Sequence, residues 1–237
     1  MIGAWLDPYD RRARLRPALL SALPFGLSLL PLVDGLAGWW TAIVPVLGYC
    51  GGASLLAQLA RDRGKRAQDH LFASWGGSPT TLLLRHRDAP NPVTLARHHR
   101  QIARLLPDLR MPTAAEEAAD PVAADQVYET ATKYLRDATR DRQAFPLIYA
   151  ELCNYGFRRN LLGLRGWALA GSAVGAGLLL GAVAEPAGGV SVPVVGALAI
   201  DALAVLVFAT IVTPKWVKIA ACEYAERLLG AIDHLPR

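Results

Sequence analysis

The chain has 237 residues, of which 53% are hydrophobic and 19% are charged. This composition is too apolar for an ordinary soluble domain and too charged for a chain embedded entirely in a membrane, so we expect a mixed protein. The net charge of +5 does not by itself indicate nucleic-acid binding, because membrane proteins gather positive residues on their cytoplasmic side. The three cysteines are far apart, without metal-binding spacing, and are expected to be reduced thiols.

The first 60 residues are expected to form a basic lead-in followed by a membrane hairpin. Residues 1–16 are amphipathic and rich in arginine, a pattern typical of segments at the membrane surface. Two apolar spans follow, at about 17–33 and 36–60, each close to the length that crosses a bilayer. Together they predict a first transmembrane hairpin over residues 17–60.

Residues 61–163 show no alternation of apolar and polar residues, so we expect a helical domain without strands. Ser-Pro and Asn-Pro pairs begin helices, paired glycines end one, and Thr113 to Glu116 has capping-box spacing. These signals predict helices over residues 61–74, 79–87, 92–106 and 121–142, and another that begins at Pro146 and continues into the third span.

The C-terminal third predicts a second hairpin over 164–213, with spans at about 166–184 and 190–213. The third span is rich in glycine at four-residue spacing, typical of close packing within one subunit or between subunits. The tail, 214–237, is amphipathic and is expected to pack on the cytoplasmic domain or to lie on the membrane. The predicted fold is all-α: a polytopic membrane protein with four transmembrane helices, arranged as two hairpins with a helical cytoplasmic domain between them.

Charge counting predicts the orientation of the chain in the membrane. The two hairpin turns contain Asp34 and Glu185 but no Lys or Arg, whereas the middle segment and both ends carry an excess of Lys and Arg. Because positive residues stay in the cytoplasm, both termini and the middle domain are predicted to be cytoplasmic.

One acidic residue interrupts the fourth span. Asp201 falls near its centre, where a carboxylate costs about 2.5–3.5 kcal/mol on insertion scales. Two interpretations remain open. Asp201 is either a protonated residue bonded to a neighbouring helix, or part of a pore, proton or ion path.

A basic face is predicted in the middle domain. Arg97, Arg100 and Arg104 are spaced by three and four residues, which places them on one side of a helix. This face is either simply solvated or an anion site for a nucleotide or oligonucleotide signal, since guanidinium groups suit phosphate. Arg158 and Arg159 would join such a site if the fold brings them near.

No enzyme is predicted, and no cofactor or metal. The chain lacks a P-loop, a dinucleotide fingerprint, an HExxH pair and a serine-elbow motif. His98 and His99 are adjacent, but neighbouring residues on a helix point apart, so they are expected to pack in a core or interface rather than to share a metal.

Two stretches, residues 74–88 (SWGGSPTTLLLRHRD) and 154–163 (NYGFRRNLLG), resemble parts of a group of uncharacterised bacterial four-span membrane proteins. The layout of two membrane hairpins around a helical domain also resembles predicted pore-forming effectors of anti-phage defence systems. This resemblance implies a membrane effector that a cytoplasmic sensor or nucleotide signal gates, and that depolarises the infected cell.

The leading hypothesis is a homo-oligomeric, gated ion channel or pore. Four spans with one buried acid enclose too little polar surface for a monomeric pore, so further copies of the chain are expected partners. A cytoplasmic partner protein, a nucleotide or oligonucleotide ligand and the lipid bilayer are the other expected partners. The alternative is a non-conducting sensor or scaffold that holds a cytoplasmic partner, and the third hypothesis is a small ion- or proton-coupled transporter.

Overall fold

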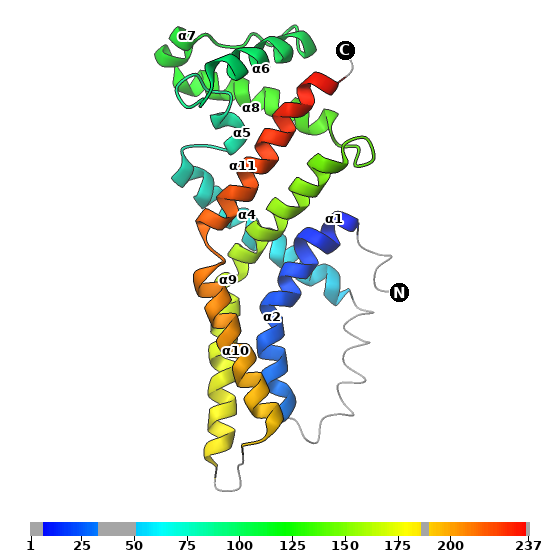
Figure 1. Cartoon of the computed structure of the whole chain (residues 1–237), viewed down its shortest axis with the longest axis vertical. Helices are drawn as coiled ribbons and strands as arrows, with labels where there is room; N and C mark the ends of the chain where they lie inside the picture. Colours follow the sequence, from blue (N-terminus) through cyan, green and yellow to red (C-terminus); the bar gives the residue numbers. More distant parts are fainter. Residues whose placement is uncertain (1–6, 33–50, 186–189, 236–237) are drawn as a thin grey trace. The chain divides into compact units, whose positions relative to one another are not determined.

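The computed structural model describes residues 7–32, 51–185 and 190–235, which Figure 1 draws as ribbon. Every regular element in these ranges is helical, and no strand occurs in them. The predicted all-α class is therefore confirmed for this part of the chain. The expected turn at Asp34 and most of the expected second span lie outside the described residues.

The chain divides into two compact units, each assembled from separate stretches of sequence. The first unit contains residues 1–68 and 156–217, and the second contains residues 69–155 and 218–237. The tail therefore packs with the middle of the chain, which was one of the two alternatives for its amphipathic face. Three helices contribute residues to both units: α4 (Gly52–Trp75), α9 (Pro146–Ala184) and α11 (Pro214–Gly230).

The helix that holds the first predicted span begins within the predicted lead-in, at Pro8. Instead of a separate lead-in before residue 17, one helical run extends from Pro8 to Leu32, because Asp7 accepts a hydrogen bond from the backbone N–H of Tyr9 and Pro8 occupies the first helical position. The run consists of α1 (Pro8–Asp10), a π-helical turn η2 (Arg11–Leu15), α2 (Arg16–Leu29) and a 3₁₀ turn η3 (Leu30–Leu32).

Among the described residues, three helices are long and apolar enough to cross a membrane: Pro8–Leu32, Pro146–Ala184 and Val192–Thr210. The last is α10, which lies within the predicted fourth span. The third predicted span is the C-terminal part of α9, which confirms that the helix beginning at Pro146 continues into it. Four spans were expected, and the described residues contain three helices with the length and apolar character of a span.

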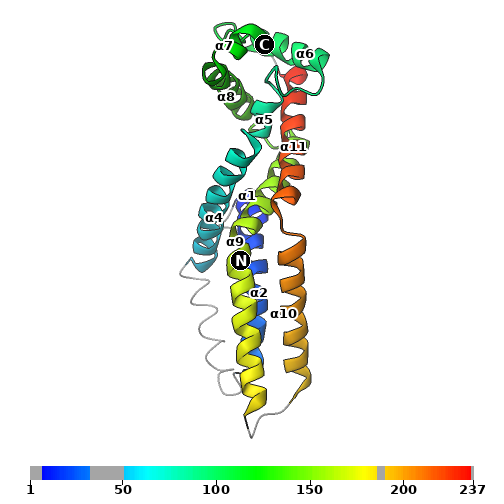
Figure 2. The same ribbon diagram turned by 90° about the vertical axis from the view of Figure 1, so that its left-hand side faces the viewer.

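In the first unit, α2, α9 and α10 run side by side in both views (Figures 1 and 2). Ala18, Ala60 and Leu164 form one buried cluster, which joins α2 and α4 to α9. Larger apolar residues join α9 to α10. The buried members of that second cluster are Leu161, Ala168, Phe208 and Val212.

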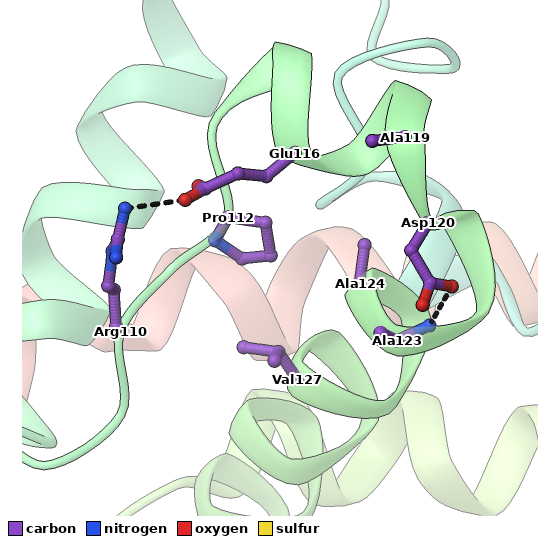
Figure 3. Close-up of a pocket in the computed structure, with 8 residues that line it drawn as sticks. All are labelled: Arg110, Pro112, Glu116, Ala119, Asp120, Ala123, Ala124 and Val127. Atoms are coloured by element: carbon purple, nitrogen blue, oxygen red, sulfur yellow. Dashed lines mark hydrogen bonds and ion pairs between the residues drawn. The ribbon is translucent and has the colours of Figure 1, made fainter.

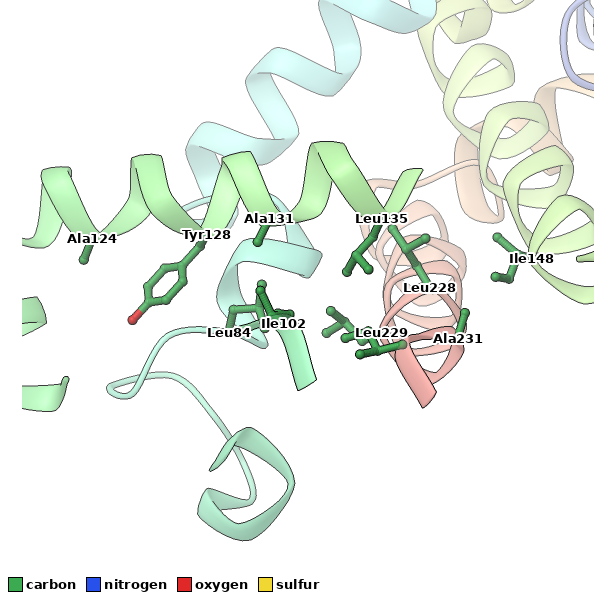
Figure 4. Packing of buried hydrophobic residues seen from close by; sticks show 11 residues of the cluster. Leu84, Ile102, Ala124, Tyr128, Ala131, Leu135, Ile148, Leu228, Leu229 and Ala231 are labelled. Atoms are coloured by element: carbon green, nitrogen blue, oxygen red, sulfur yellow. The ribbon is translucent and has the colours of Figure 1, made fainter. Parts of the chain in front are cut away.

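The second unit has its own hydrophobic core (Figure 4). Ala124, Tyr128, Ala131 and Leu135 line the buried face of one helix, with the spacing of three and four residues that a single helix face requires. The elements around this core are α5 (Pro79–Leu82), α6 (Pro92–Leu105), α7 (Ala114–Ala119), α8 (Pro121–Ala138), η4 (Ala231–His234) and the parts of α9 and α11 that belong to this unit.

The predicted helix starts are confirmed by their caps. Ser78 accepts a hydrogen bond from the N–H of Thr81, Asn91 caps α6, and Thr113 forms a complete capping box with Glu116. The paired glycines end α4 as predicted. Gly76 and Gly77 adopt positive φ angles of 81° and 150°, which side-chain-bearing residues rarely tolerate.

Two helices are shorter than predicted. α5 ends at Leu82 rather than near residue 87, because the backbone N–H groups of His86 and Arg87 bond to the carboxylate of Glu117 instead of continuing a helix. α8 ends at Ala138 rather than near residue 142. There Asp141 accepts hydrogen bonds from the next turn's backbone and redirects the chain toward α9.

Candidate functional site

Asp201 lies on α10, a helix that is otherwise apolar apart from its last residue, Thr210. It is only 2% exposed, and its carboxyl group faces α2 and α9 within the first unit. A carboxyl group at this depth in a membrane-length helix is costly unless it has a partner. The neighbouring side chains therefore decide what Asp201 can do.

Ser28 of α2 makes the direct contact with Asp201. Its Oγ lies 2.5 Å from Oδ2 of Asp201 and 3.0 Å from the carbonyl oxygen of Pro24. A hydroxyl group has one proton, so Ser28 cannot donate fully to both acceptors at once. Ser28 therefore shares one proton between the carbonyl oxygen of Pro24 and the carboxyl group of Asp201, and Asp201 receives less than a full hydrogen bond.

The other carboxyl oxygen of Asp201, Oδ1, is buried and has no hydrogen-bond partner among the described residues. Ser172 on α9 is 1% exposed, and its hydroxyl group also has no hydrogen-bond partner among the described residues. Buried polar groups are nearly always hydrogen-bonded, and an unsatisfied one costs about 1–3 kcal/mol. Oδ1 of Asp201 and the hydroxyl group of Ser172 could therefore each form a further hydrogen bond if a partner reached them.

Gly175 allows the three helices to meet at this point. A Cβ atom added there would lie 2.8 Å from Cβ and Oγ of Ser28 and 3.3 Å from Oδ2 of Asp201. Contacts below 3.0 Å would force α2 away from α9, so the site depends on the absence of a side chain. Ser172 lies three residues earlier, on the same side of α9.

A second polar junction in the first unit is built around Asn160, which is completely buried. Its Nδ2 donates to the carbonyl oxygen of Ala13 at 2.5 Å. Pro17, four residues after Ala13, has no N–H to donate to that carbonyl, so the side chain of Asn160 takes the place of the usual helix bond. Gly64 packs so closely here that an added Cβ would lie 1.8 Å from Oδ1 of Asn160.

The structure places Arg158 and Arg159 in the first unit, with partners there. Arg158 donates to the carbonyl oxygen of Trp216 at 3.0 Å, and its guanidinium group lies 4.8 Å from the centre of the Trp216 ring. Arg159 donates to Gln68 at 2.7 Å and to Oδ1 of Asn160. Both guanidinium groups therefore act as links between helices of this unit.

The predicted basic face belongs to the second unit. Arg97, Arg100 and Arg104 are all exposed on α6, as their spacing predicted. Arg97 pairs with Asp233 of η4, and Arg104 contacts Gln101 at 3.3 Å. Arg100 has no ion-pair partner among the described residues. The five candidate arginines thus divide between the two units, three in the second and two in the first.

The most extensive polar network in the second unit surrounds Glu117, which is 2% exposed. Its carboxylate accepts hydrogen bonds from the backbone N–H groups of His86 and Arg87, from Nη1 of Arg87 at 2.9 Å, and from the hydroxyl group of Tyr128 at 2.7 Å. Burial alone would raise the pKa of Glu117. The hydrogen bonds outweigh it and hold the pKa below its ordinary value of 4.5.

Arg85 and the histidines complete this network. Nε and Nη2 of Arg85 each lie 2.7 Å from a carboxylate oxygen of Asp125, a bidentate pair. His99 contacts the carbonyl oxygen of Leu84 through Nε2 at 2.8 Å, and burial lowers its pKa below the ordinary value of 6.5 despite that contact. The ring of His99 packs against Tyr128, in agreement with the expected core role.

A shallow pocket of about 390 Å³ lies beside α7 and α8 in the second unit (Figure 3). Arg110 and Glu116 form an ion pair at its edge, and Asp120 caps α8. Alanines and Val127 line the rest. Because its charged groups are already paired, this pocket offers little for a ligand to bind. No group of three or more metal-ligating side chains gathers anywhere in the described ranges.

Comparison of the chain with protein-family models, with curated proteins and with solved structures finds no match. The geometry of the first unit is therefore the basis for a functional conclusion. The sequence pointed to Asp201, and the glycine spacing that includes Gly175 predicted close packing, but nothing in the sequence identified Ser28 as the residue that both contact. A signal was present in the first span, where Ser21 and Ser28 are seven residues apart and so lie on one helix face.

Proposed function

We propose that this chain is an integral membrane protein of the bacterial inner membrane that conducts ions as a homo-oligomer, and that the described conformation is its closed state. The observation that carries the proposal is the half-satisfied carboxyl group of Asp201, buried against Ser28 at the point where Gly175 brings α2, α9 and α10 together. Ionisable residues inside membrane spans are rare and costly, and they are characteristic of ion paths and proton relays.

Opening of the path follows from the same contacts. Separation of α2 from α10 would break the Ser28–Asp201 hydrogen bond and admit water to the free oxygen of Asp201. That oxygen and the unpartnered hydroxyl group of Ser172 would then gain hydrogen bonds, so hydration offsets part of the lost helix packing. The closed and open states are thereby brought closer in free energy, as a gated element requires.

Four spans, cytoplasmic termini and a cytoplasmic second unit belong to the proposal. The three membrane-length helices are an odd number, and a further span within residues 36–60 would return the chain to the cytoplasm before residue 61. Cysteines introduced at Gly35 and Gly188 are expected to react with an impermeant thiol reagent outside intact cells, whereas Cys153 is not. External labelling of Cys153 would contradict this orientation.

The experiment that tests conduction compares Asp201 variants in liposome flux assays. Asp201→Asn keeps the shape of the side chain but cannot ionise, and we expect a change in flux or selectivity of about tenfold. Asp201→Leu removes the polar group from the path and is expected to abolish flux. Wild-type flux from both variants would contradict a role of Asp201 in conduction.

Two glycines supply a matched pair for the same assay. Gly175→Ala places a methyl group against Ser28 and is expected to disturb gating, whereas at Gly177 an added Cβ meets nothing within 4 Å. Gly177→Ala should therefore conduct like the wild type. Equal effects at the two positions would mean that the contact with Ser28 does not control the path.

A role in anti-phage defence is proposed from the layout, two membrane hairpins around a helical domain, which resembles predicted pore-forming effectors of such systems; the second unit would receive the signal. The exposed face of α6 is the proposed receiving surface. Because Arg97 pairs with Asp233, its reversal would also disturb the tail. Charge reversal at Arg100 and Arg104 alone is the cleaner test, and it should abolish signal-dependent toxicity while leaving assembly unchanged.

The second candidate function is a non-conducting membrane scaffold, and one observation favours it. Asp201 is enclosed by helices of its own chain, so it serves equally well as a link between α2 and α10. In that case every Asp201 variant that folds should retain partner binding, and neither the wild type nor any variant should carry flux.

A further inference from the structure

An apolar groove of about 690 Å³ lies in the first unit, between α2, α4 and α9. Phe25, Leu59 and Val174 are among its apolar residues, and of the described residues that line it Arg63 alone is charged. Trp167 of α9 also lines the groove and is 60% exposed. The groove thus combines a large apolar surface with one cationic group.

No carboxylate in the described part of the chain balances the positive charge of Arg63. Its guanidinium group lies 4.8 Å from the centre of the Trp167 ring, a cation–π contact, and it forms no ion pair with a carboxylate among the described residues. Arg158 and Arg159, by contrast, donate to groups of their own unit. Arg63 is therefore free to bind an external anion.

Arg63 and Trp167 lie at one end of the groove. Gly163 packs directly against the backbone of Arg63, whereas Phe25 and Gly171 approach each other about two turns further along α9. With a rise of 1.5 Å per residue, the lining from Trp167 to Val174 extends about 10 Å along α9. The end that holds Arg63 is where the apolar run of α9 begins, the level at which Arg and Trp meet lipid headgroups.

We propose that this groove binds an anionic phospholipid, with an acyl chain along the apolar lining and the phosphate group at Arg63. A guanidinium group suits the phosphate oxygens, and the apolar residues suit the chain. The inference rests on the membrane location proposed above but not on conduction. It commits to lipid because the cation stands at the headgroup level of membrane-length helices.

Gly166 offers a way to fill the groove without a clash. It lines the groove, and a Cβ atom added to it meets nothing within 4 Å. Gly166→Leu should therefore occupy the space of the acyl chain. Gly177→Leu is the matched control, because Gly177 is also open on α9 but does not line the groove. Arg61→Gln is the matched control for Arg63→Gln, two residues away on the same helix.

The experiment uses the full chain reconstituted in vesicles of equal amounts of phosphatidylcholine and phosphatidylglycerol. Co-flotation with the vesicles first tests the membrane location by itself. The protein is then extracted in detergent, and the retained phospholipids are measured by native mass spectrometry. We expect phosphatidylglycerol to be enriched about tenfold over phosphatidylcholine in the wild type and in both controls.

Arg63→Gln should reduce the enrichment to the ratio in the vesicles, and Gly166→Leu should reduce the total retained lipid. Wild-type enrichment in Arg63→Gln, or equal loss in Arg61→Gln, would overturn the proposal. If Gly166→Leu instead dissociates an oligomer without changing lipid retention, a second copy occupies the groove, and the lipid proposal is wrong. If the wild type retains phosphatidylglycerol but carries no flux in liposomes, the conduction proposal is wrong and the lipid proposal stands.

Discussion

Among the described residues, each unit contains one buried carboxyl group, and the two make very different numbers of hydrogen bonds. Glu117 accepts four hydrogen bonds, two from backbone amides and two from side chains. Asp201 contacts one hydroxyl group, which must also serve a carbonyl oxygen, and its second oxygen has no partner in the described part of the chain.

The difference separates a structural carboxylate from a candidate functional one. Four donors compensate the burial of Glu117, so its charge joins the α5–α6 loop to α7 and α8. Asp201 stabilises little where it is, and its unused oxygen remains available to water, a proton or an ion.

Glu117→Ala should have the largest effect on stability. It leaves Arg87, Tyr128 and two backbone amides without their acceptor, and removal of one partner from a buried charged pair costs about 3–5 kcal/mol. Hydrogen exchange at α7 and α8 amides of the full chain in detergent measures the loss. Protection equal to the wild type would show that Glu117 is no more a structural link than Asp201.

Tyr128→Phe removes one donor from Glu117 while keeping the ring. A hydrogen bond to a charged group contributes about 1.5–3 kcal/mol, so we expect a loss of that size in the same exchange measurement. Tyr134→Phe, on the same helix, is the control and should change little, because Tyr134 is not a donor to Glu117. A similar loss in both variants would point to ring packing rather than the hydroxyl group.

Acid should destabilise the second unit in two steps. A folded-state pKa below its ordinary value contributes stability that is present at higher pH and is lost as the pH falls through the folded pKa. For His99 the loss begins below pH 6.5, and for Glu117 it begins below pH 4.5, at up to about 1.4 kcal/mol per pH unit for each group. Denaturation at a series of pH values measures both steps, and Glu117→Gln should remove the second.

Asp201→Ala should have the smallest effect on stability. Side-chain hydrogen bonds within membranes average about 0.6 kcal/mol, and Asp201 makes one of them. Ser28→Ala should cost a similar amount, and Ser172→Ala less, because the hydroxyl group of Ser172 has no partner in the described ranges. A loss of several kcal/mol at Asp201, measured by denaturation in detergent, would make it a structural residue like Glu117.

Local features of the fold could be read from the sequence. The caps at Ser78, Asn91 and Thr113 were predicted, as was the helix end at the paired glycines, because each depends on residues within four positions. The early end of α5 could not be predicted. It depends on Glu117, which lies more than 30 residues later in a short acidic helix that looks solvent-exposed.

The candidate site was predicted only in part, for the same reason. A single acid in an apolar helix identifies Asp201, but Ser28 is 173 residues away in sequence and looks like any small polar residue of a helix. The predicted set of five arginines mixed two classes: exposed residues on α6, and residues on α9 that link helices of the first unit. The spacing of residues predicts which of them share a helix face, but it does not predict which other helix packs against that face.

The bond between Asn160 and Ala13 has a consequence for biosynthesis. The two residues are 147 positions apart, so the first helix emerges from the ribosome long before its partner exists. Until α9 is made, water or lipid headgroups must solvate the Ala13 carbonyl, because Pro17 cannot donate to it. The Ala13 carbonyl therefore gains its protein partner only after Asn160 has been synthesised, about two thirds of the way along the chain. A chain that stops before residue 160 should be left with a loosely held N-terminal helix, open to quality-control proteases.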